Sequence, residues 1–321
     1  MSILIYAEYA EGKFKKVAFE LASYAKKVAE SLGTTVTAVT VDAGDVSELS
    51  KYGVDKVLKV NNDKLSGFTA KAYADVIKQA AQKENCKLIL LSSTTDSVYL
   101  APLVAVALEA GFASNVVGLP VSTSPFQVKR TAFSNKAFMF TDISTDVKVL
   151  GLAKNSYGIF ENTSTLTEEE FNPTIEENDF GVKVKSVEKV TGKVSIADAD
   201  IVVSAGRGLK GPENWGMIEE LATVLGAATA CSKPVSDLGW RPHGEHVGQT
   251  GKPVAANLYI AIGISGAIQH IAGINSSKVK VVINSDPEAP FFKVADYGIV
   301  GDAFEIVPKL IEKLKAFKAH N

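Results

Sequence analysis

The stretch from Gln249 to His270 constrains the fold most, because it places two glycine-rich polar turns on either side of one apolar strand. The unbroken apolar run Leu258–Ile262 predicts a buried strand, and Gly263–Gly266 predicts a turn that opens a helix. Backbone N–H groups at the start of that helix would face an anion, and the glycines would let a phosphate approach the main chain closely. The pattern therefore predicts a phosphate-bearing ligand on an α/β sheet.

The composition is that of an ordinary globular protein. With 321 residues, of which 46% are hydrophobic and 22% charged, the chain is long enough for two domains. The formal net charge is −2 and no long basic block is present, so nucleic acid and anionic membranes are poor candidate partners. No stretch approaches membrane-spanning length, which argues against an integral membrane protein.

The N-terminal sequence and the two cysteines indicate the cellular compartment of the protein. The start, MSILIYAE, enters a strand directly and lacks the basic region and long apolar run of a signal peptide. Cys86 and Cys231 lie in apolar surroundings in opposite halves, which favours reduced, buried thiols over a disulfide. A cytoplasmic protein is expected.

The first half alternates strands and helices, which implies a mostly parallel sheet. The apolar patterns predict strands at Ile3–Ala7, Val36–Val41, Lys56–Val60 and Lys87–Leu91, and helices at Phe14–Leu32, Val46–Tyr52, Thr69–Glu84 and Val98–Glu109. Gly33 is expected to end the first helix. Beyond Pro120, the segment Gln127–Leu152 is typical of antiparallel strands that would close the far edge of the sheet.

A polar, acidic segment, Thr163–Lys193, separates this half from a second βαβ series. It is interpreted either as a connection between domains or as a solvated irregular segment within one domain. The second series begins at Ala199, with strands at Ile201–Val203, Ala227–Cys231, Leu258–Ile262, Val279–Ile283 and Tyr297–Val300 and a closing helix at Phe304–Phe317. We expect two domains, residues 1–195 and 196–321.

Gly206–Gly211 matches the G-x-G-x-x-G pattern of a dinucleotide site after a strand. Pro212 follows the last glycine, and the next strand ends in Ser232-Lys233 rather than in the acidic residue that would hold a ribose hydroxyl. NAD binding is therefore a weak hypothesis beside that of a tight turn with an exposed Arg207.

Three further groups carry polar chemistry, and each also has an ordinary structural explanation. Ser232 and Lys233 place a hydroxyl and a cation at the carboxyl edge of the sheet, although a lysine there can simply be solvated. Val247-Gly248-Gln249-Thr250 offers an amide and a hydroxyl that suit a heteroaromatic ring edge, although such glycine-rich loops are common. A histidine such as His270 on a buried helix is more often a core residue with satisfied hydrogen bonds than a ligand partner.

Asp286, Glu288 and Asp296 have no interleaved His or Cys, so a metal site is not expected.

The motifs VGQTGK, LYIAIGISGAIQH, INSDPEAP and VADYGIVGD, in this order, resemble the FAD-binding domain of the electron transfer flavoprotein alpha subunit. The likeness is dense from Ile201 to Leu310 and looser before it, where it includes RTAFSNKAFMF. The resemblance implies two α/β domains, each a mostly parallel sheet flanked by helices. The first would form the subunit-interface body, and the second a Rossmann-like or flavodoxin-like domain that binds FAD.

The resemblance also implies which residues hold FAD: Arg207, Ser232, Lys233, Val247, Gly248, Gln249, Thr250, Ser265, Gly266, Ala267, Ile268, Gln269, His270, Asn284, Asp302 and Ala303. In this family Arg207 would lie near the pyrophosphate or ribityl chain, and His270 near a flavin carbonyl. Asn284 and Asp302 would meet the adenosine. The family usually has Arg where this chain has Lys233, which keeps the charge but loses planar stacking. His243 and His246 receive no role.

The implied function is that of an electron carrier, since no G-x-S-x-G, Walker A, H-E-x-x-H or C-x-x-C motif supplies a substrate acid, base or nucleophile. The resemblance implies a heterodimer with a beta subunit that takes electrons from dehydrogenases such as acyl-CoA dehydrogenases and passes them to a quinone oxidoreductase. An electron-bifurcating complex is the alternative within the family. An NAD-dependent oxidoreductase or a nucleotide sensor without redox activity are the alternatives outside it.

Overall fold

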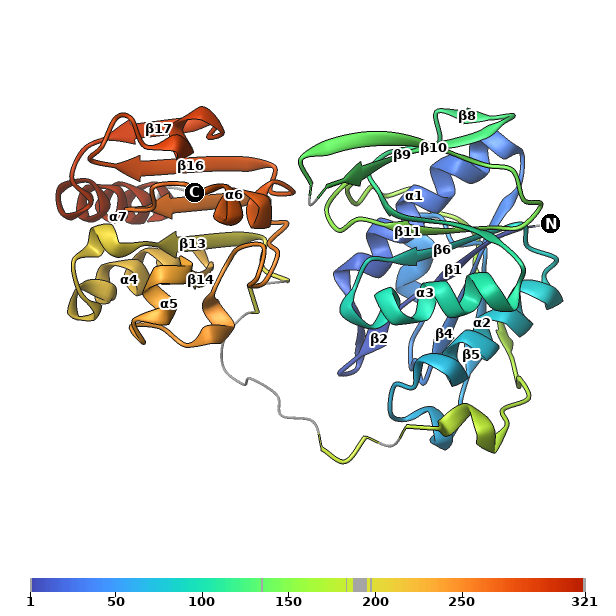
Figure 1. Ribbon diagram of the computed structural model, residues 1–321. Helices are drawn as coiled ribbons and strands as arrows, with labels where there is room; N and C mark the ends of the chain where they lie inside the picture. Colours follow the sequence, from blue (N-terminus) through green and yellow to red (C-terminus); the bar gives the residue numbers. More distant parts are fainter. Residues whose placement is uncertain (1, 134, 183, 187–194, 197, 320–321) are drawn as a thin grey trace. The chain divides into compact units, whose positions relative to one another are not determined.

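The computed structural model describes residues 2–133, 135–182, 184–186, 195–196 and 198–319 (Figure 1). The chain divides into two compact units, residues 1–133 with 137–187 and residues 188–321 with 134–136. Each unit has its own sheet and its own hydrophobic clusters, which confirms the predicted α/β fold class.

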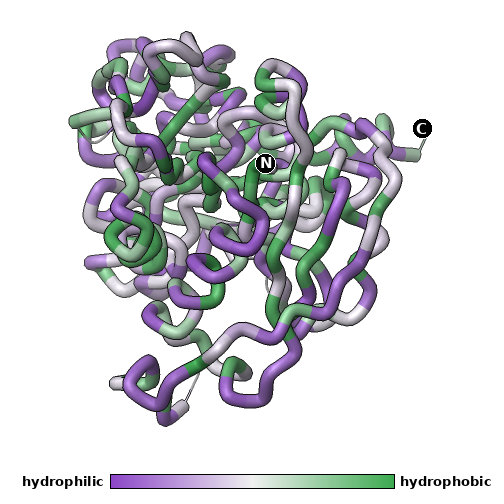
Figure 2. Tube along the Cα trace, turned by 90° about the vertical axis from the view of Figure 1, so that its right-hand side faces the viewer, coloured by the Kyte–Doolittle hydropathy of each residue, from purple (hydrophilic) through white to green (hydrophobic). Residues whose placement is uncertain are grey.

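The N-terminal unit is built on a sheet in the order β10-β9-β7-β11-β6-β1-β4-β5-β12, with β8 paired to β9. In Figure 2 the trace that leaves the marked N-terminus, strand β1, is hydrophobic, and every residue of this strand is buried. The strands are β1 (Ser2–Tyr6), β4 (Thr35–Val41), β5 (Lys56–Val60), β6 (Leu88–Ser92), β7 (Gly111–Val116), β8 (Ser122–Thr123), β9 (Phe126–Ala132), β10 (Ala137–Ile143), β11 (Lys148–Leu152) and β12 (Thr167–Glu170). The helices are α1 (Lys16–Leu32), α2 (Ala70–Lys83) and α3 (Thr95–Ala107), with 3₁₀ turns η1 (Ser47–Tyr52), η2 (Asp63–Leu65) and η3 (Glu177–Phe180).

Helix α1 ends as predicted but begins two residues later. Gly33 adopts a left-handed conformation (φ 63°) and its N–H binds the carbonyl of Ala29, which closes the helix. Phe14 was expected in the helix, but it belongs to a short hairpin of β2 (Tyr9–Ala10) and β3 (Lys13–Phe14). Its ring packs edge-on against Tyr9 at 5.1 Å, so burial of an aromatic pair overrides the helical spacing.

The prediction of antiparallel strands in Gln127–Leu152 is correct for β9 and β10 and wrong for β11. Strand β11 lies between β6 and β7, parallel to both, in the interior of the sheet. Its residues Val149 to Leu152 are buried, as expected for a strand covered on both faces. Strand β7 was not predicted, because its sequence GFASNV has neither an apolar run nor alternation.

The acidic segment Thr163–Lys193 contains an edge strand, and the boundary between the two units, at residues 187 and 188, also falls within it. Glu168, Glu169 and Glu170 belong to β12, which pairs in parallel with β5. Glu169 lies 2.7 Å from the ammonium groups of both Lys56 and Lys83. These hydrogen bonds lower the pKa of Glu169 to about 2. Lysines on β5 and α2 therefore offset the repulsion between the glutamates of β12. The acidic composition of this segment had predicted an irregular structure.

The C-terminal unit is a five-stranded parallel sheet in the order β14-β13-β15-β16-β17. Helices α4 and α7 pack on one face with Trp215, while α6 and the loop near Val247 pack on the other face with Tyr259 and Phe291. The strands are β13 (Ile201–Ala205), β14 (Ala228–Cys231), β15 (Leu258–Ile262), β16 (Val279–Asn284) and β17 (Tyr297–Val300). The helices are α4 (Gly216–Leu225), α5 (Lys233–Asp237), α6 (Ile268–Ile274) and α7 (Ala303–Ala319), with 3₁₀ turns η4 (Arg207–Leu209), η5 (Pro212–Trp215), η6 (His243–Glu245) and η7 (Pro290–Lys293).

Candidate functional site

The carboxyl edge of the C-terminal sheet contains the predicted site residues. Because all five strands are parallel, the loops that follow them emerge at one edge. The strand order reverses between β13 and β15, and such a switch point is where open α/β sheets bind ligands. Gly206 follows β13 and Gly263 follows β15, so the two glycine turns flank this position.

The two glycine turns are packed directly on each other. The N–H of Gly208 donates to the carbonyl of Gly263 at 3.1 Å. A Cβ on Gly206 would lie 2.3 Å from the Gly263 oxygen, and a Cβ on Gly208 would lie 2.7 Å from the Gly263 Cα. Gly263 itself has φ +61°, which disfavours any side chain. Glycine is thus required by the close approach of two backbones at the switch point.

The turn Gly263–Gly266 leads into α6 with an open helix start. Gly266 has φ +88°, and a Cβ there would lie 2.6 Å from the Phe291 nitrogen. Ala267 precedes the helix and no side chain caps it, so the first amides of α6 are available to an acceptor. Asn284, at the end of β16, donates from Nδ2 to the carbonyl of Ile264 at 3.0 Å and so holds the turn in place.

The loop Val247–Thr250 is clamped between β14 and α6. The Val247 N–H donates to the carbonyl of Cys231 at 3.0 Å, and the Gln249 N–H donates to the carbonyl of Gln269 at 2.8 Å. Gly248 packs against Gly273 of α6, where a Cβ would lie 2.6 Å from the Gly248 Cα. The loop therefore brings Gln249 beside the residues of α6 that the resemblance also implicates.

Two buried histidines lie beneath this loop. His270 is 6% exposed, and its Nε2 lies 2.9 Å from the hydroxyl oxygen of Tyr259. Burial, followed by the nearby His246, lowers the pKa of His270 to about 4. Burial, followed by His243 and Lys233, likewise lowers the pKa of His246. Both Nδ1 atoms are buried without a hydrogen-bond partner among the described residues.

The other predicted residues surround this centre. Lys233 is exposed at the start of α5, with its ammonium 3.0 Å from the carboxylate of Asp237, and Ser232 before it is buried. Asp302 accepts a hydrogen bond from the N–H of Phe304 at 2.9 Å and lies 3.8 Å from the ammonium of Lys210. Ala303 is buried, whereas exposed side chains are found at Arg207, Thr250, Ser265, Ala267, Ile268 and Gln269.

The G-x-G-x-x-G segment does not form the strand–turn–helix of a dinucleotide fingerprint. After Gly206 the chain makes the two 3₁₀ turns η4 and η5, and α4 begins only at Gly216. The third glycine, Gly211, therefore precedes the short 3₁₀ turn η5 and not an α-helix, which removes the α-helix start on which the NAD hypothesis depends.

Sequence analysis missed Tyr259, Lys210 and Gly273. Tyr259 is the polar member of the buried strand LYIAI, and a buried tyrosine hydroxyl needs a hydrogen-bond partner, which was an available signal. Gly273 stands inside a helix, where glycine is unfavourable and so indicates close packing. No local signal pairs Lys210 with Asp302, which follows 92 residues later.

The corresponding edge of the N-terminal sheet is filled by the chain itself. The buried carboxylate of Glu8, just after β1, accepts hydrogen bonds from Thr94 Oγ1 at 2.6 Å, Ser97 Oγ at 3.1 Å and Lys15 Nζ at 2.8 Å. Thr94 caps α3, so the carboxylate occupies the position that an anionic ligand would take at this helix start. This edge is therefore not a candidate site.

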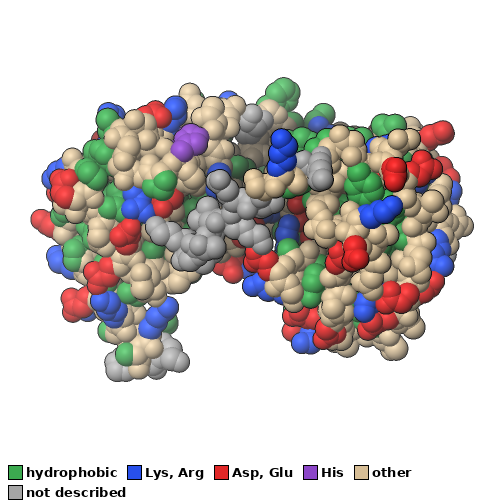
Figure 3. All heavy atoms as spheres, turned by 90° about the horizontal axis from the view of Figure 1, so that it is seen from below, with side chains coloured by type: hydrophobic (Ala, Val, Ile, Leu, Met, Phe, Trp, Pro, Cys, Tyr) green, Lys and Arg blue, Asp and Glu red, His purple; other side chains and the backbone are tan. Residues whose placement is uncertain are grey.

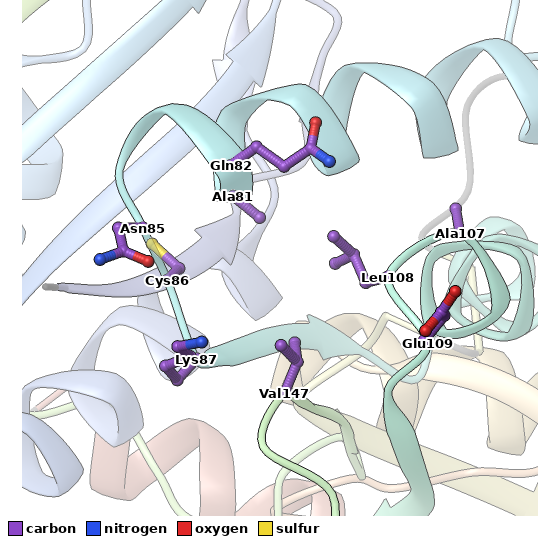
Figure 4. A pocket seen from close by; sticks show the side chains of 9 residues that line it. All are labelled: Ala81, Gln82, Asn85, Cys86, Lys87, Ala107, Leu108, Glu109 and Val147. Carbon is purple, nitrogen blue, oxygen red and sulfur yellow. The ribbon is translucent and has the colours of Figure 1, made fainter.

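A pocket of about 340 Å³ lies in the N-terminal unit near the ends of α2 and α3 (Figure 4). Its lining includes Gln82, Cys86, Leu108 and Val147 and none of the predicted site residues. Burial raises the pKa of the Cys86 thiol, and its sulfur lies 3.2 Å from the Ser2 hydroxyl, so no reactive thiolate is present.

Two other kinds of site find no support in the described residues. Those residues contain no group of three or more His, Cys, Asp or Glu side chains arranged to hold a metal ion. No helix in the described part of the chain has the length and apolar character to cross a membrane. Acidic and basic side chains are interspersed over the face shown in Figure 3.

Comparison with known proteins agrees with this geometry. Residues 195–275 match the family model of the electron transfer flavoprotein FAD-binding domain, and residues 3–178 match that of the electron transfer flavoprotein domain. The electron transfer flavoprotein subunit alpha of Thermoanaerobacterium thermosaccharolyticum is 38% identical, over 98% of each chain. That of Bacillus subtilis is 35% identical over 99% of each chain, and the protein FixB of Clostridium saccharobutylicum is 34% identical over 98% of this chain and 96% of its own. This chain therefore belongs to the alpha-subunit family of the electron transfer flavoproteins and carries their FAD-binding domain.

Proposed function

We propose that this chain is the FAD-bearing subunit of a heterodimeric electron carrier. It takes electrons from dehydrogenases such as acyl-CoA dehydrogenases and passes them to a quinone-linked acceptor, in complex with a beta subunit. The observation that carries the proposal is the arrangement at the switch point, which we call the cradle. It consists of the glycine turns at residues 206–208 and 263–266, the uncapped start of α6 and the buried His270.

The residues at this edge fit FAD. Glycine at positions 206, 208 and 263 lets the two turns pack backbone against backbone, which holds the loops together at the switch point where open α/β sheets bind ligands. The unpartnered Nδ1 of His270 calls for a ligand atom or a water molecule, since buried polar atoms are rarely left without one. When bound, FAD supplies the reversible uptake and release of electrons.

Each part of the edge has a task in holding the cofactor. The amides from Ser265 to Gln269 would meet the diphosphate, aided by the cation of Arg207. Ser232, Lys233, Gln249, Thr250 and His270 would surround the ring system, and Asn284, Asp302 and Ala303 the adenosine. The ammonium of Lys233 would favour negative charge on the ring. Its exposed ion pair with Asp237 is weak enough for the side chain to reorient.

The alternatives differ in their partners or cofactors. An electron-bifurcating complex would place the same FAD domain beside a beta subunit with its own flavin, so the partner's cofactor decides between the two. An NAD-dependent oxidoreductase would need the fingerprint helix that η4 and η5 replace.

The test is co-expression of the full chain with its beta subunit, followed by identification of the bound cofactor and reduction by an acyl-CoA dehydrogenase with its substrate. We expect a yellow complex that is reduced by the dehydrogenase and reoxidised by a quinone oxidoreductase. A colourless complex, or one that binds NAD instead, would exclude the proposal.

A pair of glycine variants tests the cradle within the same complex. Gly263→Ala adds a methyl group 2.9 Å from the Gly208 Cα, whereas Gly226→Ala has the same left-handed backbone, φ +67°, and open space around it. Both variants carry a similar backbone strain of about 1 kcal/mol. Only Gly263→Ala should weaken FAD binding, by at least about tenfold.

A further inference from the structure

A buried imidazole lies against the turn at residues 247–252. His246 is only 2% exposed. The N–H of Gly251 donates to the carbonyl of Gly248 at 3.1 Å, and the N–H of Lys252 donates to the carbonyl of His246 at 2.9 Å. The chain therefore leaves His246, turns, and returns to the backbone of the same residue.

Both glycines of this turn approach the ring of His246. A Cβ on Gly251 would lie 2.9 Å from its Cγ and Nδ1 atoms, and a Cβ on Gly248 would lie 3.5 Å from its Nε2 atom. The imidazole thus takes the space that a side chain at position 251 would need. Gln249 and Thr250, which stand between the two glycines, are exposed, and the family resemblance implies that both meet FAD.

The groups that face His246 favour its neutral form. They are His243 in η6, Lys233 and Asp237 on α5, and His270 on α6. Burial, followed by His243 and Lys233, lowers the pKa of His246, and only Asp237 raises it. His270 supplies no charge at neutral pH, because burial lowers its pKa to about 4.

The nearby carboxylates of Asp237 and Glu245 are already paired with cations. Asp237 lies 3.0 Å from the ammonium of Lys233, and both oxygens of Glu245 accept hydrogen bonds from Arg241, at 2.7 and 2.8 Å. On the side of β14, burial raises the pKa of the Cys231 thiol to about 12, so the thiol is neutral. A proton on the imidazole would therefore be a poorly compensated buried charge.

We propose that His246 is a positioning residue whose neutral ring holds the turn Gly248–Gly251 in the conformation that presents Gln249 and Thr250 to FAD. The inference rests on the proposed FAD site, and His246 acts through the turn without touching the cofactor. Because the ring is enclosed, it reaches water only if the turn opens, so protonation weakens FAD binding. By linkage, bound FAD lowers the pKa of His246.

Flavin titration of the full chain between pH 7.5 and pH 5 tests the proposal. We expect FAD to bind the wild-type chain about fivefold more weakly at pH 5. His246→Gln, whose side chain is similar in size and stays neutral, should keep the affinity at pH 7.5 and change it by less than about twofold over this range. Equal pH dependence in the two chains, or tighter binding to the wild type at pH 5, would overturn the proposal.

His243→Gln is the matched control in the same loop. The ring of His243 is exposed, and its centroid lies 5.5 Å from that of His246. This variant should keep the pH dependence and move its midpoint to higher pH, because His243 lowers the pKa of His246. A pH dependence that disappeared here would belong to His243, and the proposal would be wrong.

The linkage can also be measured without any variant that might fail to fold. In the full chain labelled with ¹³C-histidine, an NMR titration should give a lower pKa for His246 with FAD than without it. An unchanged pKa would overturn the inference. A chain that binds no FAD at any pH would contradict the proposed function itself, whereas one that binds FAD with the same affinity at pH 7.5 and pH 5 would overturn the role of His246 alone.

Discussion

At the scale of single residues, His270 makes the stability of the C-terminal unit depend on pH. Its folded-state pKa of about 4 lies below the ordinary value of 6.5, because burial disfavours the charged ring. The unfolded chain therefore binds a proton at a higher pH than the folded chain does. This contribution to stability is complete above pH 6.5 and is lost as the pH falls from about 6.5 towards 4.

We predict that the free energy of unfolding of the full chain falls by about 2 kcal/mol between pH 7.5 and pH 5 through His270. His246, whose pKa is lowered in the same direction, would add to this loss. Urea unfolding at several pH values measures the slope, and His270→Gln should flatten it. Equal slopes for wild type and variant would show that His270 is not buried in neutral form.

Lys233 is the residue at which the family resemblance implies an arginine. We predict that Lys233→Ala lowers the reduction potential of the bound flavin by roughly 20 mV, the equivalent of about 1 kcal/mol for a charge near the protein surface. Lys315→Ala, which removes the same charge from an exposed ion pair with Glu220, provides the control because α7 carries it away from the carboxyl edge. Equal potentials in the two variants would mean that Lys233 points away from the ring.

At the scale of elements, the contact between α6 and the Val247–Thr250 loop depends on Gly273. We predict that Gly273→Ala destabilises the chain by about 1–2 kcal/mol and weakens FAD binding, since the added methyl group would lie 2.6 Å from the Gly248 Cα. This loss exceeds the helix propensity that alanine would bring. Thermal unfolding and flavin titration measure the two effects.

Gly216 at the start of α4 is the matched control for Gly273. It has helical dihedral angles, and a Cβ there meets no atom within 4 Å. Gly216→Ala should therefore stabilise the chain by about 0.5–1 kcal/mol without a change in FAD affinity. If both substitutions stabilised the chain, the close approach of α6 to the loop would be disproved.

At the scale of the whole molecule, we predict that the isolated chain transfers electrons far more slowly than its complex with the beta subunit. A carrier has to present a flavin edge to large partners, and the match to the family's FAD-binding domain, residues 195–275, lies in the second unit. Sedimentation and electron-transfer assays of the chain with and without the beta subunit test this. A monomer that transfers electrons at the full rate would contradict it.

The sequence alone predicted most of the C-terminal unit. Strands β15 and β17 have the predicted bounds, and Gly263–Gly266 does precede a helix. Strand β15 is buried, and parallel strands covered on both faces are nearly continuous apolar runs, so its signal is local and needs no knowledge of neighbours. The turns at the strand ends could be predicted for a similar reason, since a single glycine indicates a backbone conformation or a close contact that other residues disfavour.

Only the tertiary structure decided which strand lies beside which and which polar atoms are partnered. Strand β11 lies in the interior of the sheet because it pairs with β6 and β7, which are distant in the sequence. Strand β12 extends the edge of the sheet because it pairs with β5, whose lysines have the opposite charge. The partner of His270 is a tyrosine of the neighbouring strand, and that of Asn284 is a carbonyl twenty residues earlier. Local propensity and periodicity describe one segment at a time, whereas register, hydrogen-bond partners and the protonation state of a buried histidine arise only when segments far apart in the chain exclude water together.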